Sequence, residues 1–414
     1  MPHVLKPDSF RNWRRNQFAI TAASFIGFAG FTLVMPFLPL YFRQLGVTDV
    51  GEAAIWSGLS LGLTPAITAL LSPLWGRVAD RFGRKLMVER SLISFVVLMS
   101  AMAYATRAWH IFVLRAVQGL FAGYGGLTLA MAAESAPKDR LASSIGMVQT
   151  AQRLGPALGP VIGAVLADAV GLRRSFFVTA GFYGIALILV VVMYGEPRAE
   201  RAIRATGSEN EPTVRKVLAF PNFVLLITAI VGIQFVDRSL GPILPLYLSE
   251  LGFADSRVAL VAGVLFSILA CAAALGHHSC GRLLRRYPPR FVIIGGGSVG
   301  GISIGLFALA TPTWLLALTM GLFGIGVGAA MTASYTAAGM VVPEGAHGTA
   351  FGLLTGALLT GQAISQVACG LLGGVSIRLV FVLDVLVLLV LVTSVRRVMV
   401  DQPLAAESGV AEQL

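Results

Sequence analysis

Few ionisable side chains interrupt the long apolar stretches of this sequence. Two acids, Asp237 and Asp384, and three bases, Arg115, Arg153 and Arg238, lie well inside such stretches. An unpaired cation in an apolar layer costs about 2.5–3.5 kcal/mol on insertion scales, so each group should face an opposite charge or a polar cavity. A carboxyl in such surroundings can bind and release a proton, and a nearby arginine can stabilise its charged form.

Asp237 is the first candidate for a proton-carrying acid. Gln234 precedes it by three residues and shares its helix face, and Arg238 follows it directly. We place Asp237 and Arg115 at a similar depth and expect them to pair. The alternative is a static ion pair of Asp237 with Arg238 or Arg115 that fixes the packing without titrating. Asp384 is the weaker candidate.

The composition requires an apolar environment. Of 414 residues, 56% are hydrophobic and 12% are charged, and the mean hydropathy is +0.81, whereas roughly 25% of the residues in a soluble domain are charged. A soluble globular domain, a disordered chain and a disulfide scaffold are therefore excluded. Cys271, Cys280 and Cys369 lack metal-ligand spacing. We expect buried thiols, no metal and no cofactor.

Twelve segments are long enough to cross a hydrocarbon layer, which takes about 20 mainly apolar residues in a helix. They comprise residues 17–42, 54–78, 86–106, 110–134, 141–168, 174–194, 222–247, 258–280, 290–311, 314–342, 347–374 and 376–395. The sequence thus predicts an all-α polytopic membrane protein.

The net charge is +11, and the basic residues are distributed unequally between the two sides of the membrane. With the N-terminus in the cytoplasm, 22 of the 31 Lys and Arg residues lie in inner loops and tails and six in outer loops. The positive-inside rule then places both termini in the cytoplasm. Because this distribution sets an orientation and forms no basic patch, no nucleic-acid partner is expected.

The two halves of the chain resemble each other. Pro36–Tyr41 returns as Pro242–Tyr247 at an offset of 206, and Gly76–Lys85 aligns with Gly281–Arg290 at an offset of 205. A duplicated six-helix bundle follows, and such parallel repeats are one plan of transporters, whose halves rock about a central site. The predicted domains are a cytoplasmic segment 1–16, a bundle 17–194, a cytoplasmic linker 195–221, a bundle 222–396 and a cytoplasmic tail 397–414.

The segment GRVADRFGRK at 76–85 resembles the signature of the major facilitator superfamily and matches it at every specified position. The resemblance implies that Asp80 caps the inner end of a facing helix near 347–349 and latches the outward-open state. Free N–H groups at a helix start favour such a carboxylate. The alternative is a basic loop that serves orientation only. The candidate gate comprises Gly76, Asp80, Arg81, Gly83, Arg84 and Lys85.

A run of small residues in 141–168 is similar to the antiporter signature of this superfamily, with Ala164 in place of its last glycine. Small residues let helices approach closely, and prolines remove helical N–H donors and bend the helix. The alternative is generic small-residue packing. The candidate residues are Gly146, Gly155, Gly159, Pro160 and Gly163.

Arg115, followed by Gln118 and Gly119, resembles a superfamily pattern in which an intramembrane arginine assists proton coupling. The candidates for proton coupling are therefore Asp237, Arg115, Arg238 and Asp384. Polar stripes and adaptable Met and aromatic side chains are candidates for a substrate pocket. They are Phe31, Met35, Gln118, Tyr124, Gln149, Gln152, Gln234, Met331, Tyr335, Gln362 and Gln366.

The resemblance, which is greatest to the drug:proton antiporters of the superfamily, covers nearly the whole chain. It implies a twelve-helix transporter in a bacterial inner membrane that exports amphipathic drugs against inward proton flow and so confers antibiotic resistance. The alternative is an importer or exchanger of a metabolite with the same fold. Because nucleotide-binding and hydrolase motifs are missing from the sequence, we expect no enzyme. The expected partners are a small molecule, protons and the bilayer, with the chain acting as a monomer.

Overall fold

The computed structural model describes residues 13–137, 140–195, 214–342 and 347–399, without some side chains in these ranges, those of Gly76 and Asp80 among them. Every regular element in this part of the chain is a helix, which confirms the all-α fold class. Ten helical spans there are long and apolar enough to cross a membrane, or up to twelve if each bent pair counts as one span. The predicted spans agree with these helices to within four residues at each end.

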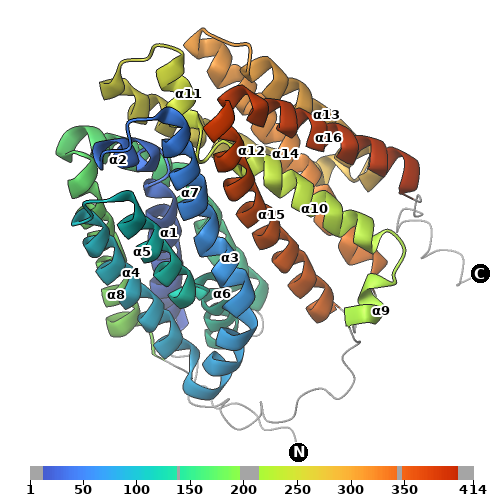
Figure 1. The fold of residues 1–414 in the computed structure, drawn as a ribbon. Helices are drawn as coiled ribbons and strands as arrows, with labels where there is room; N and C mark the ends of the chain where they lie inside the picture. Colours follow the sequence, from blue (N-terminus) through green and yellow to red (C-terminus); the bar gives the residue numbers. More distant parts are fainter. Residues whose placement is uncertain (1–12, 138–139, 196–213, 343–346, 400–414) are drawn as a thin grey trace, which may run out of the picture. The chain divides into compact units, whose positions relative to one another are not determined.

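The helices form two compact units, one of residues 1–208 with 241–267 and one of residues 209–240 with 268–414. The first unit contains α1 (Trp13–Leu33), α2 (Leu38–Gln44), α3 (Val50–Phe82), α4 (Arg84–Ala103), α5 (Ala108–Phe121), α6 (Tyr124–Ser135), α7 (Leu141–Val170), α8 (Leu172–Met193), α11 (Leu244–Glu250) and the first part of α12 (Asp255–Leu283) (Figure 1). The second contains α9 (Val214–Leu218), α10 (Phe223–Ser239), the rest of α12, α13 (Pro289–Phe307), α14 (Thr313–Val341), α15 (His347–Val375) and α16 (Ile377–Val398).

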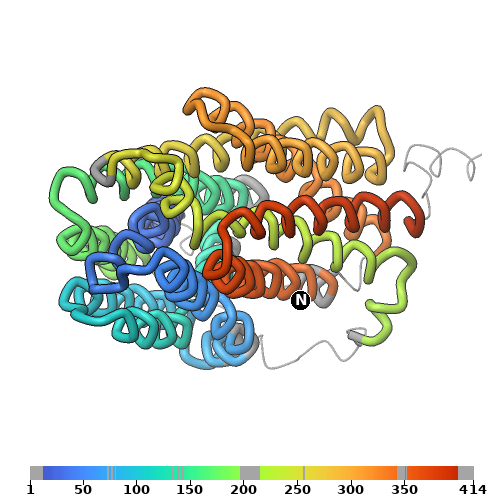
Figure 2. Tube along the Cα trace, turned by 45° about the horizontal axis from the view of Figure 1, so that its top comes forward, coloured from blue at the N-terminus to red at the C-terminus, as the bar shows by residue number. Residues whose placement is uncertain are grey.

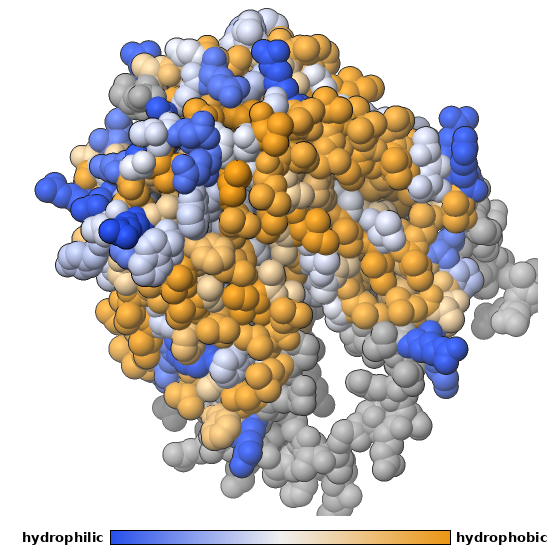
Figure 3. All heavy atoms as spheres, viewed as in Figure 1, coloured by the Kyte–Doolittle hydropathy of each residue, from blue (hydrophilic) through white to orange (hydrophobic). Residues whose placement is uncertain are grey.

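Large apolar side chains remain exposed along the spans. Examples are Ile188 and Val192 on α8 and Leu389 and Val390 on α16. Such side chains cover much of the helical surface on the face drawn in Figure 3. Because a helix satisfies its own backbone hydrogen bonds, these apolar surfaces can face lipid without exposing polar backbone groups.

The sequence repeat is also a repeat of backbone geometry. The chain bends by 47° between α1 and α2 and by 45° between α10 and α11. Each bend contains a proline, Pro36 or Pro242, which has no N–H to donate to the helical ladder. A glycine with positive φ follows each short helix, Gly46 at 99° and Gly252 at 85°. The segments 17–42 and 222–247, each predicted as one helix, are therefore divided at equivalent positions.

The predicted span 110–134 is also divided, between α5 and α6, where Gly123 takes a φ of 103° that favours glycine. The break leaves the last carbonyls of α5 without helical donors. The Trp75 indole N–H donates to the Leu120 carbonyl at 2.8 Å, and the Ser91 hydroxyl donates to the Phe121 carbonyl at 2.7 Å. Irregular backbone at membrane depth requires such replacements.

Three glycines of α7 pack directly on α1. A Cβ at Gly155 would lie 2.7 Å from the Ala29 amide nitrogen, one at Gly159 would lie 2.6 Å from the Ala29 oxygen, and one at Gly163 would overlap an α1 carbonyl. At Gly146, by contrast, an added Cβ meets no described atom within 4 Å. The small-residue run thus produces one close backbone contact, in which Gly146 takes no part.

Ala164, which replaces the last glycine of the antiporter-like pattern, faces a glycine on α12. A Cβ at Gly263 would lie 2.6 Å from the Ala164 methyl and 2.6 Å from the Pro160 carbonyl oxygen. The small residue that this contact requires is therefore on the partner helix. Helix α7 makes close contacts on two sides, with α1 and with the part of α12 that belongs to the same unit.

The second unit repeats the α1–α7 contact between α10 and α15 with one change. A Cβ at Gly361 on α15 would lie 2.6 Å from the Val231 carbonyl oxygen on α10. At the repeat offset of 206, Ser365 takes the place of Gly159, and its hydroxyl donates to the Phe235 carbonyl. At these equivalent positions the first half has glycine packing and the second has a hydrogen bond. Elsewhere along their contact, α1 and α7 are hydrogen-bonded through Gln17 and Ser144.

Replacing Gly123 with alanine should destabilise the protein by about 1–2 kcal/mol, because a Cβ is strained at positive φ. Its matched control is Gly126→Ala, since neither added Cβ would meet a described atom within 4 Å and Gly126 lies in regular helix. There alanine should raise stability by about 0.5–1 kcal/mol. Thermal unfolding in detergent measures both variants, and equal effects would contradict the strain at Gly123.

Replacing Gly159 with valine should prevent the close approach of α7 to α1 and sharply reduce the yield of folded protein, at a cost of about 3 kcal/mol or more. Gly146→Val lies on the same helix in open space and should cost less than about 1 kcal/mol. Size-exclusion profiles and thermal unfolding in detergent compare the two. If Gly159→Val were as stable as Gly146→Val, the glycine contact would not hold these helices.

Candidate functional site

Arg115 on α5 is buried in the first unit with fewer partners than its charge requires. Its side chain is 1% exposed, and its Nη1 donates to Gln118 Oε1 at 2.9 Å. The Nε and Nη2 atoms have no hydrogen-bond partner among the described residues, and neither has the Gln118 amide nitrogen. A guanidinium has donors and no acceptor and keeps its charge. The site therefore attracts an acid or anionic group and does not itself release a proton.

Aromatic side chains surround this part of the unit. The ring of Phe95 on α4 lies 5.2 Å from that of Tyr183 on α8 and 6.5 Å from that of Tyr124 on α6. The Tyr124 hydroxyl donates to the Ala23 carbonyl on α1 at 3.1 Å. The Tyr183 hydroxyl interacts electrostatically with Arg115 and has no hydrogen-bond partner in the described part of the chain. We call Arg115, Gln118, Phe95, Tyr124 and Tyr183 the Arg115 cluster.

Three members of this cluster, Arg115, Gln118 and Tyr124, are among the residues predicted from the sequence, whereas nothing in the local spacing of Phe95 and Tyr183 marks them. Arg90 is also absent from the predicted set. Its guanidinium stacks 3.6 Å from the Trp75 ring centroid and donates to the Phe121 carbonyl at 3.3 Å. Arg90 therefore holds α4 to α3 and to the end of α5, next to the break in the predicted span.

Asp237 and Arg238, adjacent on α10 in the second unit, form an ion pair. Asp237 Oδ2 lies 3.1 Å from Arg238 Nε, and the side chains are 18% and 28% exposed. The two atoms are close but not aligned as a hydrogen bond, because Arg238 Nε has no hydrogen-bond partner among the described residues. This pair is one of the two alternatives from the sequence, and a pairing of Asp237 with Arg115 stays a prediction.

Asp384 on α16 is completely buried in the second unit. Its Oδ2 accepts a hydrogen bond of 2.7 Å from the Ser239 hydroxyl at the end of α10, and its Oδ1 has no partner in the described part of the chain. The buried stripe Val380, Phe381, Asp384 and Leu388 follows the helical period. The same period can be read in the sequence and places Asp384 on the buried face of the helix. The lower rank of Asp384 among the proton-coupling candidates therefore underestimated its burial.

The described part of the candidate gate is tied to neighbouring helices. Gly83, with a φ of 99°, makes a one-residue turn between α3 and α4. Arg84 pairs with Glu134 on α6 at 2.5 Å, and Lys85 Nζ donates to the Tyr194 carbonyl after α8 at 2.8 Å. These contacts fasten α4, α6 and α8 at one end of the first unit.

The rest of the candidate gate is less constrained by the structure. Arg81 is exposed at the end of α3, where its guanidinium lies 5.4 Å from the Phe82 ring centroid. The surroundings of Gly76 and of residues 347–349 and the side chain of Asp80 are not among the parts that the structure describes. The latch therefore stays a prediction.

Two of the substrate-pocket candidates in the first unit, Gln118 and Tyr124, come together in the Arg115 cluster. Gln152 on α7 lies beside it, since its amide nitrogen donates to the Gly125 carbonyl at 2.9 Å and to Thr128 Oγ1 at 3.1 Å. The remaining first-unit candidates differ in burial: Met35 is buried, Phe31 is half-buried and Gln149 is exposed.

In the second unit, Gln234, Met331 and Gln366 are buried, and Tyr335 and Gln362 are half-buried. Gln366 Oε1 has no hydrogen-bond partner among the described residues, and the Tyr335 hydroxyl donates to the Leu354 carbonyl at 3.4 Å. The buried glutamines Gln234 on α10 and Gln366 on α15 therefore add to the polar groups of this core, which also include Ser239, Ser365 and Asp384.

His277 on α12 lies within a candidate membrane span and is not among the residues predicted from the sequence. Its Nδ1 forms a hydrogen bond of 2.6 Å with Thr332 Oγ1 on α14. A titratable group inside a span is a functional candidate by default, and in the sequence only the acids and arginines of the spans marked such candidates.

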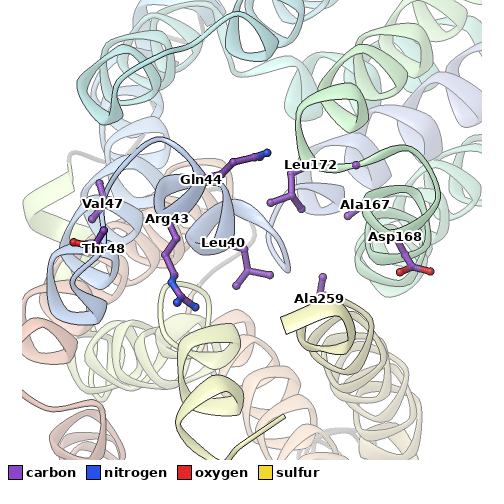
Figure 4. A pocket seen from close by; sticks show the side chains of 10 residues that line it. Leu40, Arg43, Gln44, Val47, Thr48, Ala167, Asp168, Leu172 and Ala259 are labelled. Carbon is purple, nitrogen blue, oxygen red and sulfur yellow. The ribbon is translucent and has the colours of Figure 1, made fainter. Parts of the chain in front are cut away.

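A cavity of about 560 Å³ lies in the first unit, away from the predicted pocket residues. Figure 4 shows Arg43 and Gln44 of α2, Asp168 of α7 and Ala259 of α12 around it. In the predicted orientation it is on the outer side. None of the residues predicted from the sequence for the substrate pocket lines this cavity.

The comparisons with known proteins agree with this architecture. The family model described as Major Facilitator Superfamily matches residues 20–313 and 279–412. Multidrug resistance protein MdtG of Salmonella arizonae is 34% identical over 329 residues, which are 78% of this chain and 80% of that protein. The MdtG protein of Salmonella paratyphi A is 35% identical over the same shares of both chains.

Solved structures show the same fold. A bacterial homologue of the human lysosomal transporter Spinster, inward-facing and occupied, has a TM-score of 0.75 at 16% identity and covers 95% of this chain and 97% of its own. A mutant of the nucleoside transporter NupG has a TM-score of 0.71 at 14% identity and covers 92% of this chain and 98% of its own. The resemblance predicted from the motifs is confirmed, and the chain belongs to the major facilitator superfamily, as a secondary transporter of small molecules in a membrane and not an enzyme.

Proposed function

We propose that this protein exports amphipathic drugs or related small molecules in exchange for protons, by alternating access, from a bacterial inner membrane with both termini in the cytoplasm. The observation that carries the drug assignment is the similarity to MdtG multidrug resistance proteins over 78% of the chain. Apolar and aromatic surroundings with a few polar groups, as in the Arg115 cluster, suit an amphipathic ligand.

Proton coupling is supported by ionisable side chains inside the bundles. Asp237 and Arg238 form an ion pair whose atoms are not aligned as a hydrogen bond. Two nitrogens of Arg115, Nε and Nη2, have no hydrogen-bond acceptor among the described residues. An acid that alternates between a proton and a cation as partner can exchange protons when the helices move. In this proposal Asp237 carries the proton, and Arg115 and Arg238 stabilise its charged form.

Inverted membrane vesicles that contain the protein test this function. After a proton gradient has been imposed, addition of a lipophilic drug from a broad panel should release protons from the lumen, and a protonophore should abolish drug uptake. Vesicles without the protein are the control. Drug uptake that survives the protonophore would refute coupling, and a response to metabolites in place of drugs would favour the alternative transporter function.

Replacing Asp237 with asparagine should abolish drug-induced proton movement while leaving expression and drug binding intact. The amide keeps the shape of the carboxyl but cannot bind and release the proton. Glu250→Gln, an exposed acid at the end of α11, is the matched control and should retain coupling. Proton-sensitive dye in the vesicles measures both. Full coupling in Asp237→Asn across a pH series would remove Asp237 as the carrier.

Replacing Asp80 with asparagine should slow transport strongly and change the accessibility of the inner side, because the amide lacks the charge that favours a helix N-terminus. Drug uptake and cysteine labelling from the inner face measure the two effects. Glu89→Gln, which loses only a contact of 3.7 Å to Lys85, serves as the control. Unchanged turnover together with unchanged labelling in Asp80→Asn would contradict the latch.

A further inference from the structure

Asp384 is the carboxyl most completely withdrawn from solvent in the described part of the chain. It lies on the buried face of α16, which runs beside α13 (Figure 2) and also packs on α10 and α15. No ion pair joins it to a described cation, and one of its oxygens lacks any described hydrogen-bond donor. A charged carboxylate in this position would be both unpaired and incompletely hydrogen-bonded, which is a costly arrangement.

A protonated carboxyl fits the same geometry better. Ser239 Oγ lies 2.7 Å from Asp384 Oδ2 and 2.9 Å from the carbonyl oxygen of Val236. If the proton is on Oδ2, the carboxyl donates to Ser239, and the Ser239 hydroxyl donates to Val236. The Ser239 hydroxyl has only one hydrogen, so it can make full hydrogen bonds to both oxygens only when the protonated acid donates one of them. Binding of a proton therefore completes a chain of two hydrogen bonds.

The charged and titratable neighbours are few. On α10, Asp237 and Arg238 precede Ser239 and pair with each other. On α15, the buried Cys369 thiol interacts electrostatically with Asp384. On α13, the basic residue is Arg290 at the far end, where it bonds to the Arg396 carbonyl near the end of α16.

The remaining bases of α16 itself are also remote from Asp384. Arg378 is exposed near the start of the helix, and Arg396 and Arg397 lie in its last turn. The ion pair at positions 237 and 238 is the nearest charged group along α10, and it is already formed. Nothing in these neighbours offsets a negative charge on Asp384 in this conformation.

The position of Ser239 gives the proton a mechanical consequence. Ser239 is the last residue of α10, and the chain passes from the second unit to the first between Leu240 and Gly241. Loss of the proton would leave the hydroxyl shared between the carboxylate and Val236. The anchor of α10 just before this crossing therefore depends on whether Asp384 holds a proton.

We propose that Asp384 is a proton-binding site, separate from Asp237, whose occupancy fixes the end of α10 through Ser239. This inference rests on the proposed proton coupling and deepens it by adding a second carboxyl. Its partner Ser239 lies just before the point where the chain leaves the second unit. In the conformation described, the proton is bound. Deprotonation requires a conformation in which water or a cation reaches Asp384.

Infrared difference spectroscopy on the full-length protein in nanodiscs tests the site without a transported compound. During a pH titration, wild type should show the C=O band of a protonated, buried carboxyl, with the small downward shift in D₂O that identifies an acid. Asp384→Asn should lose this band, and Asp237→Asn should keep it. Because the readout needs no substrate, it can succeed even if the vesicle assay finds no drug–proton exchange.

Ser239→Ala is the second variant, and it retains the carboxyl while removing its hydrogen-bond partner. The C=O band should move to higher frequency, because a carboxyl with weaker hydrogen bonds has a stiffer C=O bond. This variant decides the question if Asp384→Asn does not fold. The proposal is overturned if the band persists in Asp384→Asn, if it disappears in Asp237→Asn alone, or if Ser239→Ala leaves its frequency unchanged.

Discussion

Every polar group that this chain places inside an apolar layer needs a partner from the chain itself, and most of the architecture follows from that constraint. The carbonyls freed at the end of α5 are bonded by Trp75 and Ser91. The bends after α1 and α10 occur at prolines, which donate no N–H in any case. At the end of α5, side chains thus replace the hydrogen bonds that the interrupted helix no longer makes, as irregular backbone at membrane depth requires.

The same constraint makes the exceptions informative. Arg115 has two nitrogens without described partners, and Asp384 has one such oxygen. Each lies in a different unit, and a proton or a ligand is what would satisfy it. Replacing a buried, incompletely bonded ionisable residue with an apolar one of similar volume is often neutral or stabilising, so stability alone does not explain either residue, whereas the proposed transport cycle, in which such groups change partners, would.

The sequence was sufficient for the helices because each span is a long apolar run, and it was sufficient for the repeat because Pro36 and Pro242 stand in the same local context. It was insufficient where a contact joins distant segments. Nothing local links Tyr183 to Arg115, or Ser239 to Asp384. The break at Gly123 was also hidden, because it lies among several glycines and only its φ of 103° distinguishes it. The helical period of α16 did indicate that Asp384 is buried. The peripheral position of the equivalent helix in the family nevertheless gave Asp384 a lower rank among the proton-coupling candidates.

The two halves have kept one backbone contact and changed its chemistry. In the first, α7 approaches α1 through Gly155 and Gly159; in the second, Gly361 keeps the approach and Ser365 bonds to the Phe235 carbonyl of α10. The glycine contact is held by close packing, and hydrogen bonds between Gln17 and Ser144 join the same two helices near their starts. In the second half, Ser365 adds a hydrogen bond within the contact itself, which helps to fix the register of α10 against α15. Register matters in the second half because α10 carries the Asp237–Arg238 pair and Ser239. The hydrogen bond between Ser239 and Asp384 forms only when α10 stands at one position along α16. The two repeats thus differ at one position of this contact: glycine packing in the first half is replaced by a hydrogen bond in the half that carries the proposed proton-binding site.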